Sequence, residues 1–127
     1  MTLFAVYGTF GRGQPGHGRL AGARFVGEAR TAPRYRLFLV DGRWPALVPD
    51  EDGVEIPCEL YEADEPLLSE LAHVEPPGWE RATLELADGL VVDAFVGGHE
   101  LAARGVDISD YGSWAEFVRS TAYQTTS

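Results

Sequence analysis

Turn signals recur at short intervals along this chain, and they limit the regular elements that it can form. Asp41-Gly42 and Ala87-Asp88-Gly89 each separate two short apolar runs, a pattern typical of β-hairpins. Residues 50–53 form a further polar turn. The runs between these turns are rich in β-branched and aromatic residues and are too short for long helices. The spacing therefore predicts a protein built mainly from short strands.

We expect strands over residues 3–6, 24–30, 35–40, 44–49, 54–62, 81–86 and 90–96. The prolines that bound residues 44–49 place this segment at the edge of a sheet. Shorter helices are expected at 18–22, at 101–104 and after Ser109 or Ser113, and the polar end 124–127 predicts a frayed terminus. Together these elements predict an α+β fold, a small mixed β-barrel with flanking helices, in a single domain over residues 1–127.

One segment changes to a helical period. Apolar residues recur at helical spacing between residues 67 and 74, Asp64 precedes them as an N-cap, and Pro76-Pro77 ends the run. Glu75 follows this helix on the face that carries its apolar residues. A carboxylate there, close to Trp79, should be partly desolvated, which raises its pKa into a range useful for proton transfer. The alternative is a rim glutamate whose head reaches water.

Charge and cysteine content narrow the classes of function. The formal net charge of −10 argues against a nucleic-acid or anionic-membrane surface. The single cysteine, Cys58, excludes an intrachain disulfide, and the amino terminus shows no signal peptide, so we expect a cytoplasmic location. His73 and His99 lack ligand spacing to a second His or Cys, so no metal site is predicted.

The first strand is followed by a loop with four glycines within nine residues. Glycine lets the backbone approach a ligand closely, and successive N–H groups in such a loop can converge on an anion. A glycine-rich surface turn without a ligand would have the same composition. Residues 11–16 also fit the G-x-G-x-x-G pattern of dinucleotide sites, but Pro15 delays any helix and no βαβ alternation follows.

Several of these segments together resemble a known family. Residues 6–10 with 12–15, residues 22–31, residues 58–62 and a helix ending at Glu75 resemble the γ-glutamylcyclotransferase-like superfamily, in particular its γ-glutamylamine-cyclotransferase and butirosin-deacylase branch. The resemblance covers roughly residues 3–97. It implies a small mixed β-barrel flanked by helices.

The resemblance also implies a site and a reaction. The backbone N–H groups of Tyr7, Gly8, Thr9 and Phe10 would bind the carboxylate of a γ-glutamyl group, and Glu75 would be the general acid and base. The freed α-amine would attack its own side-chain carbonyl, so that 5-oxoproline forms and an amine leaves without a cofactor. The partner implied is a small molecule with a free carboxylate.

The sequence also departs from that branch. Pro76-Pro77-Gly78-Trp79 replaces the usual segment after the glutamate, which would place Trp79 in the substrate wall. Residues 31–37 and 107–114 resemble the C-terminal domain of allophanate hydrolase, which shares this fold, is implicated in decarboxylating N-carboxycarbamate, and lacks the intact glycine turn and the helix-end glutamate. Decarboxylation of a small carboxylated urea derivative and non-catalytic binding of a small molecule are therefore the alternatives. Pairing into a homodimer stays open.

Overall fold

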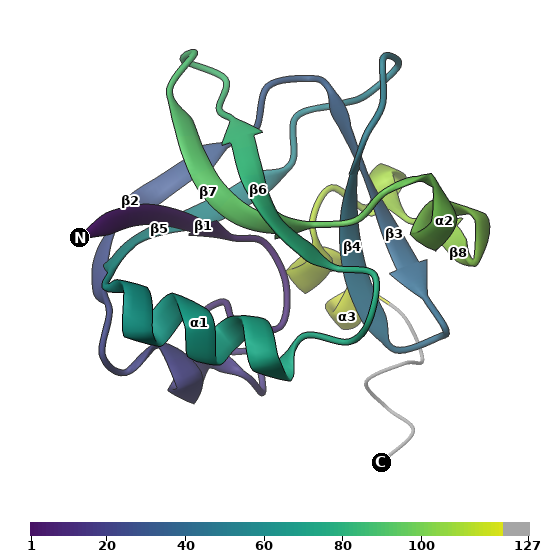
Figure 1. Ribbon diagram of the computed structural model, residues 1–127. Helices are drawn as coiled ribbons and strands as arrows, with labels where there is room; N and C mark the ends of the chain where they lie inside the picture. Colours follow the sequence, from purple (N-terminus) through teal and green to yellow (C-terminus); the bar gives the residue numbers. More distant parts are fainter. Residues whose placement is uncertain (121–127) are drawn as a thin grey trace.

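The computed structural model describes residues 1–120, so the predicted frayed end at 124–127 lies outside the described residues. The elements in chain order are β1 (Thr2–Val6), the 3₁₀ helix η1 (His17–Leu20), β2 (Arg24–Arg30), β3 (Tyr35–Val40), β4 (Trp44–Pro49), β5 (Pro57–Ala63), α1 (Glu65–Val74), β6 (Glu80–Glu85), β7 (Val91–Val96), α2 (His99–Ala103), β8 (Gly105–Asp107), the 3₁₀ helix η2 (Ser109–Tyr111) and α3 (Trp114–Ser120). Figure 1 shows their arrangement.

The strands form two sheets. The larger has the order β2-β5-β1-β7-β6, and the smaller has the order β4-β3-β8. Neighbouring strands are antiparallel except β1 and β7, which run parallel with Phe4 opposite Asp93. The strand β1 is therefore at the centre of the larger sheet, where it is hydrogen-bonded on both edges. The residues that directly follow β1 therefore begin at a strand that is held on both sides.

The α+β class predicted from the sequence is confirmed, and every predicted strand is present. Across residues 1–120 the strands lie in two sheets and do not close into a continuous barrel. The prediction missed β8, since three residues with an exposed Val106 carry no alternation of burial. It also began β5 too early, because Val54 forms only an isolated bridge with Tyr35.

Three apolar clusters hold the layers together. The largest fills the space between the two sheets and includes Leu37, Leu47 and Leu84, all fully buried. A second lies between the larger sheet and α1 and includes Phe4 and Leu71. A third lies between the smaller sheet and α2. Figure 1 shows α1 covering the larger sheet and α2 beside the smaller one.

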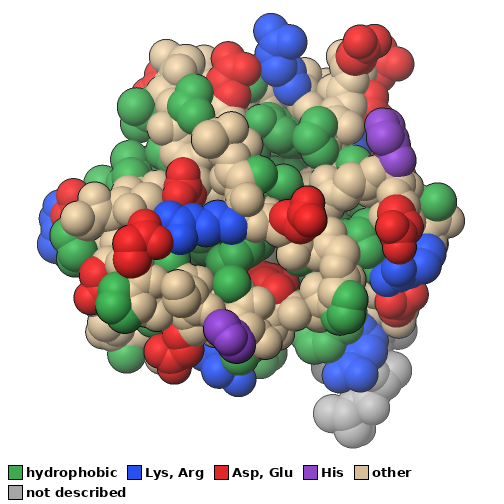
Figure 2. Space-filling view, viewed as in Figure 1, with side chains coloured by type: hydrophobic (Ala, Val, Ile, Leu, Met, Phe, Trp, Pro, Cys, Tyr) green, Lys and Arg blue, Asp and Glu red, His purple; other side chains and the backbone are tan. Residues whose placement is uncertain are grey.

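The surface is acidic but mixed. Acidic and basic side chains are interspersed over the face seen in Figure 2, which matches the eleven ion pairs found among residues 1–120. No helix within those residues is both long enough and apolar enough to cross a bilayer.

Candidate functional site

The chain turns away from β1 at residues 7–10, which we call the first turn. These residues line an inner cavity of about 390 Å³, part of it open to solvent. Its wall also contains Glu75 and Trp79, so the cavity brings together all the site residues predicted from the sequence. Sequence reasoning missed the other residues of the wall, which are Phe4, Ala5, Val6, Trp44, Pro45, Pro76 and Phe95.

The first turn presents unused backbone donors. The carbonyl of Gly8 accepts a hydrogen bond from the Gly11 N–H at 3.0 Å, that of Thr9 accepts from the Gly16 N–H at 2.8 Å, and that of Phe10 lies 2.9 Å from the His17 Nδ1. Within residues 1–120, no protein acceptor is hydrogen-bonded to the N–H groups of Gly8, Thr9 and Phe10. Three successive N–H groups without a protein acceptor are available to bind a carboxylate or an oxyanion.

Close packing explains the glycine at position 8. A Cβ atom added to Gly8 would lie 2.4 Å from Pro45 Cγ, far inside van der Waals contact. The first turn therefore rests directly on the start of β4. Its shape depends on the absence of a side chain at this position rather than on an unusual backbone angle.

Glu75 reaches the cavity from the end of α1. Asp64 caps the start of this helix by accepting a hydrogen bond from the Leu67 N–H at 3.0 Å. The helix ends at Val74, and Glu75 has the extended angles φ −71° and ψ 138° that the following proline favours. The extended backbone at this C-cap therefore positions the Glu75 side chain. The spacing instead predicts that Glu75 continues the apolar face of the helix.

The environment of Glu75 changes its acidity. Its side chain is half-buried, and within residues 1–120 its carboxylate makes no ion pair and no hydrogen bond. Burial disfavours the charged form and raises the pKa of Glu75 from the ordinary 4.5 to about 7. A carboxyl group with this pKa can both accept and donate a proton near neutral pH.

This raised pKa has a consequence for stability. The folded state holds the Glu75 proton between pH 4.5 and about 7, whereas the unfolded state has released it, so the free energy of unfolding falls as the pH rises through this range. Relative to Glu75→Gln, the wild type should lose up to about 3 kcal/mol between pH 4.5 and 7. Urea denaturation of both proteins at pH 5 and pH 8 measures the difference. A stability difference that is the same at both pH values would contradict the raised pKa.

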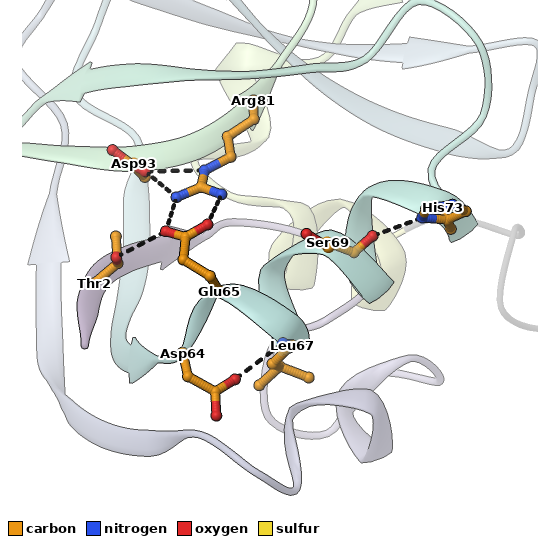
Figure 3. A network of polar contacts seen from close by, with 8 residues as sticks. All are labelled: Thr2, Asp64, Glu65, Leu67, Ser69, His73, Arg81 and Asp93. Atoms are coloured by element: carbon orange, nitrogen blue, oxygen red, sulfur yellow. Dashed lines mark hydrogen bonds and ion pairs between the residues drawn. The ribbon is translucent and has the colours of Figure 1, made fainter.

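A network of charges fixes the other end of α1. Arg81 of β6 donates to both carboxylate oxygens of Glu65, at 2.7 and 2.8 Å, and also to Asp93 of β7. Thr2 of β1 donates to Glu65 at 3.3 Å. Figure 3 shows Arg81 between the two carboxylates. These contacts tie the start of α1, at Glu65, to three strands of the larger sheet. The helix that positions Glu75 is therefore held at its start by polar contacts.

Hydrogen bonds from two side chains, the buried Trp79 and the partly buried Tyr7, join the opposite wall of the cavity. The indole of Trp79 donates to the Pro45 carbonyl at 2.9 Å. The hydroxyl of Tyr7 donates to the Phe95 carbonyl at 2.7 Å and accepts from the Leu47 N–H at 3.1 Å. Burial raises the pKa of Tyr7, so the phenol stays protonated. Trp79 serves both as core and as cavity wall.

Removing the Tyr7 hydroxyl should weaken the fold. Tyr7→Phe leaves the Leu47 N–H and the Phe95 carbonyl without their partner, and each is buried. We expect the free energy of unfolding to fall by about 1–3 kcal/mol in urea denaturation. The control is Tyr111→Phe, which removes a hydroxyl from an exposed side chain and should change stability by less than about 0.5 kcal/mol. Equal effects of the two substitutions would contradict the bridging role.

A wider depression lies outside the inner cavity. This outer pocket encloses about 890 Å³, including open solvent, and shares Thr9, Phe10, Trp44, Glu75 and Pro76 with the inner cavity. Glu75 therefore stands at the junction of the two. A ligand bound at Glu75 can therefore contact the linings of both.

Cys58, His73 and His99 line neither the inner cavity nor the outer pocket. Cys58 is buried in the core, and burial raises the pKa of its thiol to about 12. The Tyr61 hydroxyl donates to Glu59 at 2.8 Å. His73 lies 2.8 Å from the Ser69 carbonyl, and His99 is exposed. No cluster of potential metal ligands occurs in the part of the chain that the structure describes.

The glycine motif at residues 11–16 does not open an α-helix. It forms successive turns that lead into the 3₁₀ helix η1, and β2 follows. The Gly16 N–H donates to the Thr9 carbonyl, so this segment supports the first turn. The geometry of a dinucleotide site, a strand followed by a helix that begins at the glycines, is absent here.

Comparison with known proteins identifies the family. A family model for the C-terminal domain of allophanate hydrolase matches residues 2–119. The chain belongs to the allophanate hydrolase C-terminal domain family. No curated protein matches this chain.

Solved structures agree with that assignment. A protein specific to uropathogenic Escherichia coli is 30% identical, with a TM-score of 0.87 over 94% of this chain and 97% of its own. The AIG2-like protein of Mus musculus is 32% identical, with a TM-score of 0.62 over 77% of this chain and 76% of its own. This allophanate hydrolase C-terminal family member therefore has the γ-glutamylcyclotransferase-like fold, and the resemblance found in the sequence is confirmed.

The urea amidolyase of Kluyveromyces lactis also contains this fold. It is 22% identical, with a TM-score of 0.87 over 94% of this chain but only 8% of its own length. At this identity the likeness concerns the fold alone. This family member thus corresponds to a small part of that larger protein.

Proposed function

We propose that this chain is a γ-glutamyl cyclotransferase, which releases an amine from a γ-glutamyl amide or peptide and forms 5-oxoproline. The observation that carries the proposal is the pairing in one cavity of a proton-accepting carboxyl group, Glu75, with the free N–H groups of Gly8, Thr9 and Phe10. The fold that the chain shares with the AIG2-like protein supports an enzymatic role.

The proposed reaction begins with proton transfer. Glu75, as the carboxylate, takes a proton from the α-ammonium of the substrate. The freed nitrogen attacks the γ-carbonyl carbon of the same molecule, and the carbonyl oxygen becomes an oxyanion. Because both groups belong to one substrate, correct positioning supplies much of the rate.

Collapse of this intermediate completes the reaction. The bond between the γ-carbon and the amide nitrogen breaks as the carbonyl re-forms, and the departing nitrogen is protonated. Two protons move in all from the attacking to the leaving nitrogen, and Glu75 is placed to carry them. The products are 5-oxoproline and an ammonium ion, and neither water nor a cofactor is consumed.

The first turn serves this reaction in a second way. Its free N–H groups would hold the substrate carboxylate, which fixes the α-nitrogen relative to Glu75. Trp79 would form the wall against which the substrate packs.

The family assignment favours a second candidate, decarboxylation of a small carboxylated urea derivative such as N-carboxycarbamate. An assay that measures two products separates the candidates. We expect 5-oxoproline from γ-glutamyl amides, and no CO₂ above background from N-carboxycarbamate generated in the assay. Release of CO₂ without 5-oxoproline would favour the second candidate. Absence of both, with ligand binding retained, would favour a binding module.

A further inference from the structure

The side chain of Glu59 holds the segment that follows the first turn. One carboxylate oxygen, Oε1, accepts a hydrogen bond from the Arg12 N–H at 3.1 Å, and the other, Oε2, accepts one from Arg12 Nε at 3.1 Å. The Tyr61 hydroxyl also donates to Oε1, at 2.8 Å. Three donors therefore bind this carboxylate, and two of them belong to one residue of the loop.

The backbone of Glu59 holds the other end of the same segment. Glu59 lies opposite Val6, the last residue of β1, in the antiparallel pairing of β1 with β5. The chain thus leaves the larger sheet at Val6, forms the first turn, and returns to the same residue of β5 at Arg12. Between these points the Gly11 N–H donates to the Gly8 carbonyl at 3.0 Å. One residue of β5 therefore fixes both ends of the loop that contains the first turn.

The surroundings of Glu59 keep this attachment charged and in place. Its side chain is only 19% exposed. Burial alone would raise the pKa of Glu59, but the hydrogen bonds from Tyr61 and Arg12 outweigh burial and hold this pKa below its ordinary value. The Arg12 guanidinium lies over the Phe25 ring, 4.3 Å from its centroid, and pairs with Glu28 at 2.9 Å. Hydrogen bonds to an ionised acceptor are stronger than neutral ones, so the loop is firmly attached to β5 and β2.

Glu59 lines neither the inner cavity nor the outer pocket, so it would act on a substrate through the loop. We propose that Glu59 is a positioning residue, which fixes the N–H groups of Gly8, Thr9 and Phe10 in the orientation that binds the substrate carboxylate. The inference rests on the proposed cyclotransferase function. Donors that are oriented before the substrate arrives bind it without the cost of ordering the loop. Without the Glu59 carboxylate, the loop loses its attachment at Arg12 and this cost returns.

Two substrates that differ at the glutamyl α-carboxyl group test the proposal. γ-Glutamylglycine carries the carboxylate that the first turn would bind, and its α-carboxamide analogue does not. We expect the wild type to prefer the acid by about 10²-fold in kcat/KM, because the amide loses hydrogen bonds to a charged group. In Glu59→Ala this preference should fall to about tenfold, mainly through a higher KM for the acid. A variant that is only less stable would turn over both substrates less and keep the ratio.

Two further variants complete the comparison. Glu59→Gln keeps an oxygen acceptor, so it should restore part of the preference, and it carries the same test if Glu59→Ala does not fold. Glu62→Ala removes a carboxylate from the same strand, where that group accepts hydrogen bonds from Arg24 and not from the loop, so it should keep the wild-type ratio. Circular dichroism and thermal unfolding show whether each variant is folded.

Amide hydrogen exchange measures the loop without any substrate. The Gly11 N–H is bonded within the loop and not to Glu59, so its exchange rate reports opening of the loop itself. We expect this amide to exchange faster in Glu59→Ala than in the wild type, and at the wild-type rate in Glu62→Ala. An unchanged rate in Glu59→Ala would contradict the positioning role.

The kinetic outcomes separate this inference from the function on which it rests. A wild-type ratio in Glu59→Ala, or an equal loss of preference in Glu62→Ala, would overturn the positioning role and leave the cyclotransferase proposal intact. Absence of 5-oxoproline from both substrates, with the wild type no different from Glu75→Gln, would overturn both.

Discussion

Replacing Glu75 with glutamine should lower kcat/KM for 5-oxoproline release by about 10²- to 10⁴-fold. The amide has nearly the shape of the carboxyl group but cannot take a proton from the substrate ammonium. Because Glu75 is half-buried and makes no hydrogen bond within residues 1–120, the exchange should leave the walls of the cavity in place. Steady-state kinetics with γ-glutamylglycine measures the effect.

The control for this prediction lies on the same helix. Glu70→Gln makes the same chemical change at an exposed position of α1 and should keep wild-type activity. In the wild type, kcat/KM should fall as the pH drops below about 7, since Glu75 then binds a proton and is no longer a base. Unchanged turnover in Glu75→Gln, or a flat pH profile between 5.5 and 7.5, would show that another group transfers the proton.

Replacing Gly8 with alanine should damage the site from its other side. The new Cβ would lie 2.4 Å from Pro45 Cγ, so the first turn and β4 must separate by roughly 1 Å to reach ordinary contact at 3.4 Å. A displacement of this size in a group that positions a substrate can lower the rate by about 10²-fold. We also expect a loss of about 1–3 kcal/mol in the free energy of unfolding, because the contact lies in packed structure.

A second glycine of the same loop region provides the control. A Cβ added to Gly18 meets no atom within 4 Å, and Gly18 has no positive φ, so Gly18→Ala should keep both activity and stability. A crystal structure of Gly8→Ala would show directly whether the first turn moves. Wild-type kinetics in this variant would mean that the turn does not hold the substrate.

Local sequence signals were sufficient for most of the fold. Hairpin dipeptides, the Asp64 cap and the Pro76-Pro77 stop each act through neighbouring residues, and the structure places the corresponding elements where they predict. The prediction missed the short strand β8, because its pairing with β3 is a long-range contact that a pattern of three residues does not indicate. The arrangement in two sheets likewise depends on packing between distant segments.

The site was predictable only in part for the same reason. Tyr7 to Phe10 and Glu75 stood out because glycines after a strand and a carboxylate beside a helix end are locally unusual. Pro45 did not, since the 2.9 Å hydrogen bond that it accepts from Trp79 and its contact with Gly8 join residues more than thirty positions apart. The lining of the outer pocket carried no local signal either, because only the folded chain brings its residues together.

The central position of β1 has a consequence for how such a protein can diverge. The first turn is continuous with a strand paired on both edges, so a change that displaces this turn also acts on the larger sheet. Glu75 instead occupies a helix terminus followed by a connecting segment, where a substitution removes chemistry and leaves the architecture intact. A change at the helix end can therefore alter the chemistry of the cavity while the larger sheet keeps its strand order.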